Sequence, residues 1–477
     1  MSEDCLLYIG GEWVRSDSGR TFASTDPATG ERVATLQEGT PDDVDRAVAA
    51  AAAVAPRLRR SGVETRAGWC EAVAAAIEAQ AGPLARALSA EQGKPLAEAE
   101  GEVVTAALGF RAAAGHVRHL DGTITPVSDP DKRVLSRRVA RGVYAVVTPW
   151  NFPVNIPTEY LAPALATGNA VVWVPAPTTS HVAVLFTRII ASAGLPAGTL
   201  NLVTGPGPVV GDAAVAHPDV HGVGFTGSSA TGAHIARRAA GKAQLLELGG
   251  NGPTIVLDDA DLEAAAVAIA SGAFFNAGQT CAATEVVLVE RGAHDELARL
   301  LADRVRDVVL GPGTDGDTTM GPLNNDGVAT KMDDHVADAV ERGATTLTGG
   351  ARSGLFYEPT VLSGVPPQAR LVREESFGPI VPLVPVDSAE EALDIASGPE
   401  FGLVASVWSR SARRAFAVAE ELRTGIVNIN DSSTWWEIHV PFGGGSGTLS
   451  GTGRLGGMHT LLEMTEIKTI TFGTSSF

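Results

Sequence analysis

The chain has 477 residues, 44% hydrophobic and 19% charged, which is enough apolar material for a large core and, at about 150 residues per domain, for two or three domains. Its 36 basic and 55 acidic residues give a net charge of −19, which repels phosphate backbones and anionic lipid surfaces, so neither nucleic acid nor a membrane is an expected partner. Three scattered cysteines, the lack of a bilayer-length apolar run and the acidic start Met1–Asp4 predict a cytoplasmic protein.

The first clear element begins at Thr40. Thr40 is suited to be a helix N-cap, Pro41 suits the first helical position, and the acidic residues that follow complement the helix dipole. The alanine-rich sequence beyond predicts that long helices dominate the first 120 residues. Residues 121–139 are polar and basic, and we expect them to form an arm that pairs with a partner subunit.

From Gly142 onwards, apolar strands alternate with helices. We predict strands at 142–148, 170–174, 200–203 and 286–290 and near Ile380 and Val404, and helices at 161–166, 181–191, 262–275 and 294–309. Such alternation is typical of parallel, doubly wound sheets. The expected fold class is therefore α/β, with two Rossmann-like parallel-sheet domains that meet near the glycine turn 249–252.

Three short motifs carry candidate chemistry: Pro149–Pro153, Glu247–Gly250 and Gly278–Cys281. A thiol at Cys281 and a carboxylate at Glu247, each on a glycine-containing turn, predict covalent catalysis followed by hydrolysis. The amide of Asn151, on a proline-flanked loop, is suited to hold an oxyanion. Taken alone, Cys281 is equally consistent with a buried structural thiol.

A glycine-rich turn at 225–232 follows an apolar strand and precedes a helix expected at 233–240. Its free backbone N–H groups could bind a pyrophosphate, or the turn could simply reverse the chain. Gly227 and Gly232 match a P-loop, but Ala233 and His234 stand where lysine and a hydroxyl residue are required, which disfavours ATP chemistry.

Two further patterns lack the context that their function needs. Gly451–Gly456 fits GxGxxG, but a glycine-rich segment precedes it, so we predict a loop. His116 and His119 are spaced to share a helix face, yet no third ligand lies nearby in the sequence. We expect no metal site.

With these motifs in order, the chain resembles the aldehyde dehydrogenase superfamily, of the NAD(P)-dependent, hydrolytic type, over nearly its whole length. The resemblance rests on Tyr8–Trp13, Pro149–Pro153, Phe225–Gly232, Glu247–Gly250, Gly278–Cys281, Glu375–Pro379, Pro441–Gly444 and Thr465–Ile470. It implies a cofactor-binding domain (1–121 and 141–246), a catalytic domain (247–446) and a small β oligomerisation arm (122–140 and 457–477). A homodimer or homotetramer is expected.

The resemblance also implies a mechanism for oxidising a small-molecule aldehyde to its acid. The Cys281 thiolate would form a thiohemiacetal, whose oxygen is held by the Asn151 amide and the Cys281 backbone N–H. Hydride would pass to NAD or NADP, and Glu247 would activate the water that hydrolyses the thioester. Residues expected at the cofactor are Thr148, Pro149, Trp150, Val174, Pro177, Gly227, Ser228, Leu248, Glu375 and Phe377.

Two departures from the family pattern bear on specificity. Val174 and Pro177 stand where the family usually has a lysine and often a glutamate that hold the adenosine ribose, which leaves NAD and NADP both open, with a slight preference for NAD. Residues expected to line the substrate pocket are Asn155, Glu159, Trp435, Trp436, His439 and Phe442. Because none is arginine or lysine, we predict a neutral, polar or aromatic aldehyde rather than succinate semialdehyde.

Three other functions remain open from the sequence. Acyl transfer to coenzyme A is disfavoured because relatives of that kind generally lack the carboxylate found at Glu247. A non-redox cysteine esterase would need a histidine beside Cys281, and His439 is the candidate. A binding scaffold without activity would explain Val174 and Pro177 but not the presence of all three candidate catalytic residues.

Overall fold

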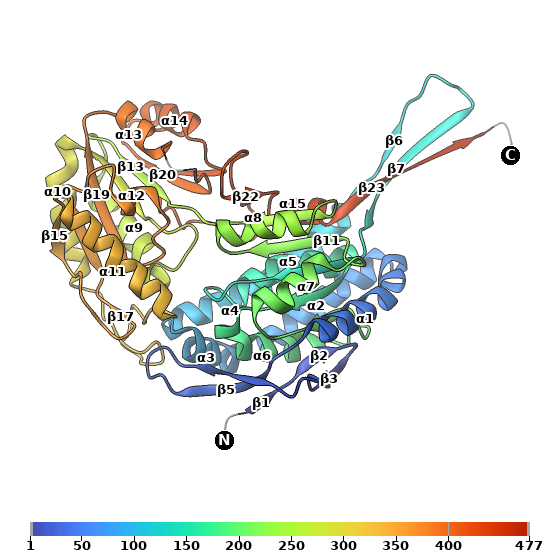
Figure 1. Cartoon of the computed structure of the whole chain (residues 1–477). Coiled ribbons are helices and arrows are strands. Elements are labelled where there is room, and N and C mark those ends of the chain that lie inside the picture. Colours follow the sequence, from blue (N-terminus) through green and yellow to red (C-terminus); the bar gives the residue numbers. More distant parts are fainter. Residues whose placement is uncertain (1–2, 399, 475–477) are drawn as a thin grey trace.

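The computed structural model describes residues 3–398 and 400–474 (Figure 1). The first two residues of the acidic start and the last three of the expected arm lie outside these ranges. An eight-stranded sheet in one lobe has the order β22-β12-β11-β8-β9-β10-β2-β3. Its strands are β2 (Leu7–Ile9), β3 (Glu12–Val14), β8 (Val143–Val147), β9 (Ala170–Val174), β10 (Leu200–Leu202), β11 (Gly222–Thr226), β12 (Ala243–Glu247) and β22 (Gly451–Thr452).

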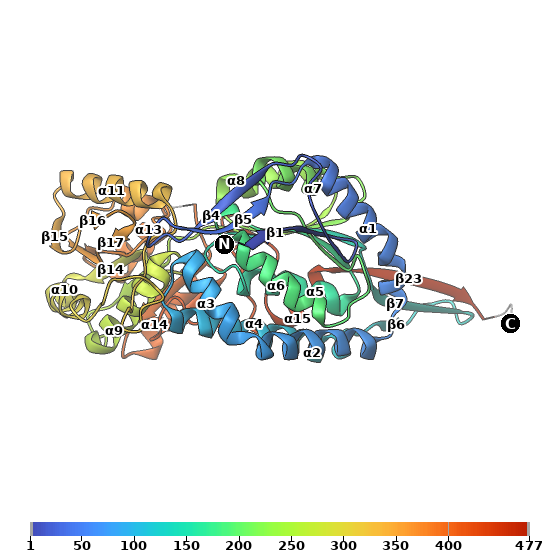
Figure 2. The same ribbon diagram turned by 90° about the horizontal axis from the view of Figure 1, so that it is seen from below.

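The five central strands of this sheet, β8 to β12, run parallel, and their side chains sort alternately to two faces. On β8, Val143 and Ala145 pack on one side, whereas Tyr144 and Val146 pack on the other. Figure 2 shows helices on both sides of the sheet. They are α1 (Pro41–Arg60), α7 (Asp212–Ala216) and α8 (Ser229–Arg238) on one face, and α2 (Val63–Ala79), α3 (Ala81–Gln92), α4 (Leu96–His116), α5 (Asn155–Thr167), α6 (Ser180–Ser192) and α15 (Gly457–Glu463) on the other.

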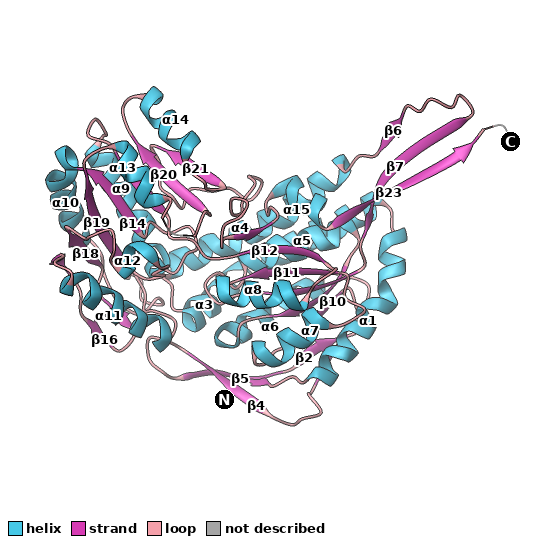
Figure 3. Cartoon of the chain, turned by 45° about the horizontal axis from the view of Figure 1, so that its top comes forward, coloured by secondary structure: helices cyan, strands magenta, loops and turns pink. Residues whose placement is uncertain are grey.

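A seven-stranded sheet in the second lobe has the order β15-β18-β19-β14-β13-β20-β21, parallel except for β15 (Figure 3). Its strands are β13 (Pro253–Val256), β14 (Val286–Glu290), β15 (Thr345–Thr348), β18 (Thr360–Ser363), β19 (Ile380–Val386), β20 (Val404–Trp408) and β21 (Ile426–Ile429). The helices are α9 (Leu262–Phe274), α10 (Arg291–Val305), α11 (Asp326–Glu341), α12 (Arg370–Arg373), α13 (Ala389–Ala396) and α14 (Ala412–Glu421). The α/β class with two parallel sheets is confirmed.

Three smaller sheets complete the chain. An arm of β6 (Thr123–Thr125), β7 (Lys132–Ala140) and β23 (Thr465–Gly473) projects from the body (Figure 1). The other two join β1 (Glu3–Cys5), β4 (Thr21–Thr25) and β5 (Arg32–Gln37), and β16 (Arg352–Ser353) with β17 (Phe356–Tyr357). Whether the arm contacts a second subunit, and where the domains divide, stay predictions.

The capping prediction at Thr40 is confirmed, because Thr40 Oγ1 accepts from the Asp43 N–H and the Asp43 carboxylate accepts from the Thr40 N–H. The long helices expected in the first 120 residues are α1 to α4, from Pro41 to His116, and the described residues before them form five strands. One local prediction was wrong. Gly451–Thr452 is a strand and not a loop, since it pairs with Leu246–Glu247 at the sheet edge.

Two helix predictions also need correction. The helix expected at 233–240 begins at Ser229, because the Ser228 side chain caps it by accepting from the Thr231 N–H. His116 ends α4, whereas His119 lies in the 3₁₀ turn that follows, so they do not share one α-helical face. Within residues 3–398 and 400–474, no cluster of three or more His, Cys, Asp and Glu side chains is arranged to hold a metal ion, and no helix is long and apolar enough to cross a bilayer.

Candidate active site

Three candidate side chains meet where neighbouring parallel strands end. The loop after β8 carries Asn151, β11 ends at Thr226, and β12 ends at Glu247, which is paired in register with Thr226. Because β8, β11 and β12 are adjacent and parallel, their carboxyl ends share one edge of the sheet. Cys281 reaches the same place from the second lobe, between α9 and β14.

The backbone that carries Cys281 is held in an unusual conformation. Asn276 and Ala277 both adopt left-handed φ values, of 50° and 53°, and Gly278 follows at 71°. A Cβ on Gly278 would lie 2.2 Å from the carbonyl oxygen of Gly378, so only glycine fits there. At Gly278, the cysteine loop therefore packs closely against the loop that contains Phe377.

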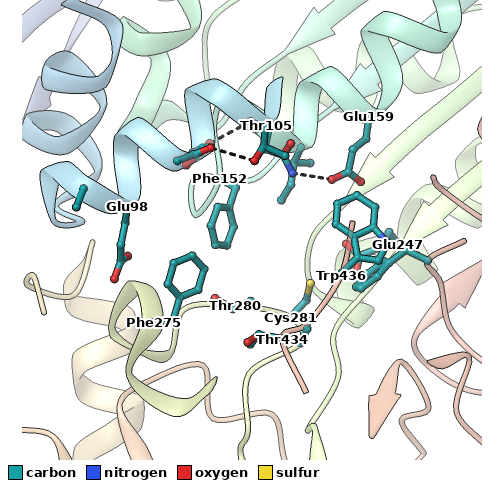
Figure 4. A pocket seen from close by; sticks show the side chains of 17 residues that line it. Glu98, Thr105, Phe152, Glu159, Glu247, Phe275, Thr280, Cys281, Thr434 and Trp436 are labelled. Carbon is teal, nitrogen blue, oxygen red and sulfur yellow. Dashed lines mark hydrogen bonds between the residues drawn. The ribbon is translucent and has the colours of Figure 1, made fainter. Parts of the chain in front are cut away.

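Two cavities lie on either side of Cys281 and Glu247, and both side chains line both cavities. We call the larger, of about 540 Å³, the substrate-side cavity. Figure 4 shows it from close by, with the sulfur of Cys281 facing the space below Glu159 and Trp436. Its described lining is Ala97, Glu98, Gly101, Glu102, Thr105, Phe152, Asn155, Ile156, Glu159, Glu247, Phe275, Thr280, Cys281, Ala282, Thr434, Trp436 and Phe442.

The smaller cavity, of about 190 Å³, is called the cofactor-side cavity below. Seven residues expected at a cofactor line it together with the catalytic candidates. Its described lining is Pro149, Trp150, Asn151, Thr226, Gly227, Ser228, Glu247, Leu248, Gly249, Cys281, Val328, Lys331, Glu375 and Phe377. Seven of the ten expected cofactor residues thus lie at one cavity, namely Pro149, Trp150, Gly227, Ser228, Leu248, Glu375 and Phe377.

Three expected cofactor residues lie away from this cavity. Thr148 is buried and accepts a hydrogen bond of 2.9 Å from Nε1 of Trp173. Val174 is fully buried at the end of β9, and Pro177 is exposed at the start of a short 3₁₀ turn. Among the expected substrate residues, Trp435 and His439 do not line the substrate-side cavity. Trp435 is 48% exposed, and His439 pairs with Glu437.

Burial controls the protonation of the two central groups. It raises the pKa of Glu247 to about 8, a direction that Glu375 reinforces and that hydrogen bonds from Cys281 and Thr226 oppose. Burial and the nearby Glu247 raise the pKa of the Cys281 thiol well above its ordinary value. Because Oδ1 of Asn151 and Oε1 of Glu247 are buried with no protein partner in the described chain, both can still accept a hydrogen bond.

Asn151 is held by a buried polar network. Its Nδ2 donates to the Gln279 carbonyl at 3.0 Å, and its own carbonyl accepts from Lys94 Nζ at 2.8 Å and from Asn276 Nδ2 at 3.1 Å. Lys94 also pairs with Glu102 at 2.6 Å, and both side chains are almost completely buried. The network ties the Asn151 loop to the cysteine loop through side chains from α4 and its approach.

The cofactor-side cavity is held by a second group of acidic and basic side chains. The Glu285 carboxylate accepts from the backbone N–H groups of Ser376 and Phe377, which holds Phe377 at its left-handed φ of 62°. Lys331 Nζ donates to the Glu375 carbonyl at 3.2 Å and lies 6.0 Å from the Phe377 ring centroid. The Phe377 ring meets Trp150 edge-on at 5.6 Å.

Sequence reasoning missed several lining residues. Lys331 and Val328 come from α11, whose apolar positions do not signal a ligand. Glu98, Phe152, Phe275 and Thr434 line the substrate-side cavity, and of these only Phe152 stood inside a recognised motif. The role of Lys94 was missed as well. A buried lysine needs a partner for its charge, but the sequence does not show that Lys94 is buried.

Known proteins are similar to this chain over nearly its whole length. The model of the aldehyde dehydrogenase family matches residues 13–470. The 3-sulfolactaldehyde dehydrogenase of Pseudomonas putida is 37% identical over 471 residues, which cover 98% of this chain and 96% of that protein. The NADP(+)-dependent succinate-semialdehyde dehydrogenase GabD of Escherichia coli is 37% identical over 474 residues, 98% of this chain and 97% of the relative.

Solved structures give the same result. The succinate-semialdehyde dehydrogenase from Burkholderia pseudomallei superposes with a TM-score of 0.96 at 38% identity, covering 98% of both chains. The betaine aldehyde dehydrogenase from Staphylococcus aureus, solved in complex with NAD+, has a TM-score of 0.95 at 34% identity, covering 98% of this chain and 94% of that one.

Proposed function

The chain belongs to the aldehyde dehydrogenase family and oxidises an aldehyde to the carboxylic acid with NAD or NADP, and we propose that it does so through Cys281, Asn151 and Glu247. The observation that carries the assignment is that Cys281 and Glu247 line both cavities. A group that must meet the aldehyde and the cofactor in turn has to face both spaces.

In the proposed first step, the thiolate form of Cys281 adds to the aldehyde carbon and the carbonyl electron pair moves to oxygen, which forms the alkoxide of a thiohemiacetal. Asn151 Nδ2 and the Cys281 backbone N–H hold the negative oxygen. Loss of hydride from the same carbon leaves a thioester on Cys281. When bound, the oxidised nicotinamide supplies a positively charged ring that accepts this hydride.

Hydrolysis completes the proposed cycle. Glu247 in its carboxylate form takes a proton from water, the hydroxide adds to the thioester carbon, and the thiolate leaves as the acid forms. Support comes from the pKa of about 8, which is close to the range in which a general base works at neutral pH. Because Glu247 lies against the thiol, the acyl group need not travel before water attacks.

For the cofactor, we propose that the pyrophosphate binds at the N-terminus of α8, beside Gly227 and Ser228. Glu375 is proposed to hold the nicotinamide ribose and Phe377 to pack beside the ring. The residues fit, because Ser228, the N-cap of α8, lines the cofactor-side cavity together with Gly227, and the first N–H groups of a helix have no partner within the helix. Val174 and Pro177 stay proposed neighbours of the adenosine end, where the preference between NAD and NADP is decided.

We further propose that the aldehyde carries no carboxylate, although several relatives are named for semialdehydes. None of the described residues lining the substrate-side cavity is arginine or lysine. A carboxylate buried there would meet carboxylates and no counter-charge.

The test is a screen of aldehydes with NAD and with NADP, following reduced nicotinamide and identifying the product with and without coenzyme A. We expect a free acid in both cases. A coenzyme A thioester, or consumption of ester substrates without any reduced cofactor, would refute the hydrolytic redox cycle.

We also propose a homodimer or homotetramer. The arm exposes an apolar set in the described chain, namely Ile124, Leu135, Ile467, Ile470 and Phe472. Exposed apolar side chains on a projecting sheet are unfavourable in water, and contact with a second subunit would bury them. Light scattering of the eluted protein measures the mass; a monomer at working concentration would contradict the proposal.

A further inference from the structure

The substrate-side cavity has an unbalanced charge. Four carboxyl side chains line it, whereas no arginine or lysine is among its described lining residues: the carboxyls are Glu98, Glu102, Glu159 and Glu247. Lys94 lies 3.9 Å from the centroid of the Phe152 ring, but it is fully buried and is not among the described lining residues. A cavity of this composition favours a positively charged occupant.

Three of the four carboxyls already have a partner within the protein or a role in the reaction. Glu102 pairs with Lys94 and accepts from the N–H groups of Val154 and Asn155 at 2.8 and 3.0 Å. Glu98 accepts from the Asn276 N–H at 3.0 Å, and although burial raises its pKa to about 7, the charge of Lys94 opposes this rise. Glu247 serves the reaction proposed above. These three therefore do not need a cation from the substrate.

Glu159 differs from them. It accepts a hydrogen bond of 2.9 Å from Asn155 Nδ2, which is a neutral donor, and no arginine or lysine among the described lining residues balances its charge. Oδ1 of Asn155 is itself buried and has no partner among the described atoms. The two side chains thus offer a carboxylate and an amide oxygen next to each other, both of which are acceptors for N–H groups.

Aromatic rings complete the surroundings of Glu159. Trp436 meets Phe442 edge-on at 5.5 Å, and its Nε1 donates to the Val440 carbonyl at 2.8 Å, which holds the indole in place. Figure 4 shows Glu159 and Trp436 at one end of the cavity and Glu98 at the other, with Phe152 and Phe275 between them. A carboxylate and an indole that line the same cavity are a combination that binds ammonium groups by charge and by cation–π attraction.

We propose that the substrate of this enzyme is an aldehyde bearing a protonated amine, with the ammonium group bound by Glu159 and Asn155 beside Trp436 and the aldehyde carbon at Cys281. This assignment rests on the proposed function, and it replaces the neutral substrate expected from the sequence with a cationic one. It requires no new chemistry, because the ammonium group only positions the aldehyde.

The protonation of Glu159 agrees with the assignment. Burial and the charge of Glu247 raise its pKa well above the ordinary value, while the Asn155 hydrogen bond opposes this. Glu247, Cys281 and Tyr160 are titrating groups that interact with it. A bound cation favours the carboxylate form, so an ammonium substrate should displace a proton when it binds, whereas a neutral aldehyde should not.

The test compares three aldehydes that share the same –CH₂CH₂CHO unit: 3-aminopropanal, butanal and succinate semialdehyde. With saturating cofactor, we expect kcat/KM for 3-aminopropanal to exceed that for butanal by about tenfold or more, as one charge-assisted hydrogen bond predicts. Succinate semialdehyde should be the poorest of the three.

The variant Glu159→Gln keeps the shape but removes the charge, so it should lower the ratio of kcat/KM for 3-aminopropanal to that for butanal by about tenfold. Glu159→Asp, which keeps the charge, should retain most of the ratio. Glu296→Gln on the exposed face of α10 is the matched control and should leave the ratio unchanged. Thermal melts of each variant establish that it is folded.

The outcomes separate the two levels of the assignment. If butanal is oxidised as well as 3-aminopropanal, or if Glu159→Gln leaves the ratio unchanged, the ammonium site is refuted and the proposed function stands. If none of the three yields reduced cofactor with either NAD or NADP, the proposed function is refuted together with the site.

Discussion

The two cavities beside Cys281 differ in charge and in how they are built. The substrate-side cavity is lined by aromatic rings and carboxyls, whereas the cofactor-side cavity includes a lysine, Lys331, next to Glu375. Cys281 and Glu247 belong to both. This difference predicts which substitutions should affect the whole reaction and which should affect the binding of only the aldehyde or only the cofactor. Residues shared by both cavities should alter turnover, and residues of one cavity should alter one Michaelis constant.

The largest effect is expected at the shared sulfur. Cys281→Ala removes the atom that makes the aldehyde carbon tetrahedral, and we expect formation of reduced cofactor to fall by about 10⁴-fold or more. Absorbance of reduced nicotinamide measures it, with Cys70→Ala, a buried thiol away from both cavities, as the control. Steady turnover by Cys281→Ala would refute the nucleophile.

Glu247→Gln should separate the two half-reactions. Acylation needs no general base for water, so we expect a burst of at most one reduced cofactor per active site, followed by steady-state turnover lowered about 10²- to 10⁴-fold. Rapid mixing resolves the burst. Undiminished steady-state turnover would show that another group activates the water.

The same residue sets the expected pH dependence. Because the folded pKa of Glu247 is about 8, its carboxylate fraction, and with it the hydrolysis rate, should rise through about pH 8. For stability the sign is reversed. The folded protein retains a proton that the unfolded chain loses near the ordinary value of 4.5, so the wild type loses stability between about pH 4.5 and 8. The gain in melting temperature from Glu247→Gln should therefore grow from pH 5 to pH 8.

A smaller effect is expected at Asn151, which lines the cofactor-side cavity but is proposed to act on the aldehyde oxygen. Asn151→Ala should lower kcat about 10²- to 10³-fold, the usual result of removing one oxyanion donor. If the amide served only cofactor binding, the Michaelis constant for NAD or NADP would rise and kcat at saturation would be restored. The two readouts thus assign Asn151 to one cavity or the other.

The smallest effect should sharpen the contrast in charge. Lys331→Met removes the cation that donates to the Glu375 carbonyl and lies over Phe377, so we expect the Michaelis constant for the cofactor to rise by about tenfold. The constant for the aldehyde should stay within about twofold. Arg306→Met, which removes an exposed cation away from both cavities, is the control. An equal rise for both ligands would remove the distinction between the cavities.

Much of this protein was determined by its local sequence. The alternation of apolar strands and helices predicted the α/β class, Ala170–Val174 was predicted to the residue, and the signals around Thr40 predicted the cap. The glycine-rich motifs that precede Cys281 and follow Glu247 predicted chemistry because a turn with unusual backbone geometry allows few residue types. Such features depend on neighbours along the chain, and a sequence displays those neighbours directly.

Tertiary structure alone decided what surrounds the reactive atoms. The strand at Gly451–Thr452 forms because the edge of β12 is available for pairing. Lys94 can be buried because it pairs with Glu102 and donates a hydrogen bond to the Asn151 carbonyl. The acidic side chains that line the cavity with Glu159 come from α4, α5 and β12, and they extend along the chain from Glu98 to Glu247. Electrostatic interactions depend on distance in space, so the charge of a cavity becomes visible only once the chain has folded.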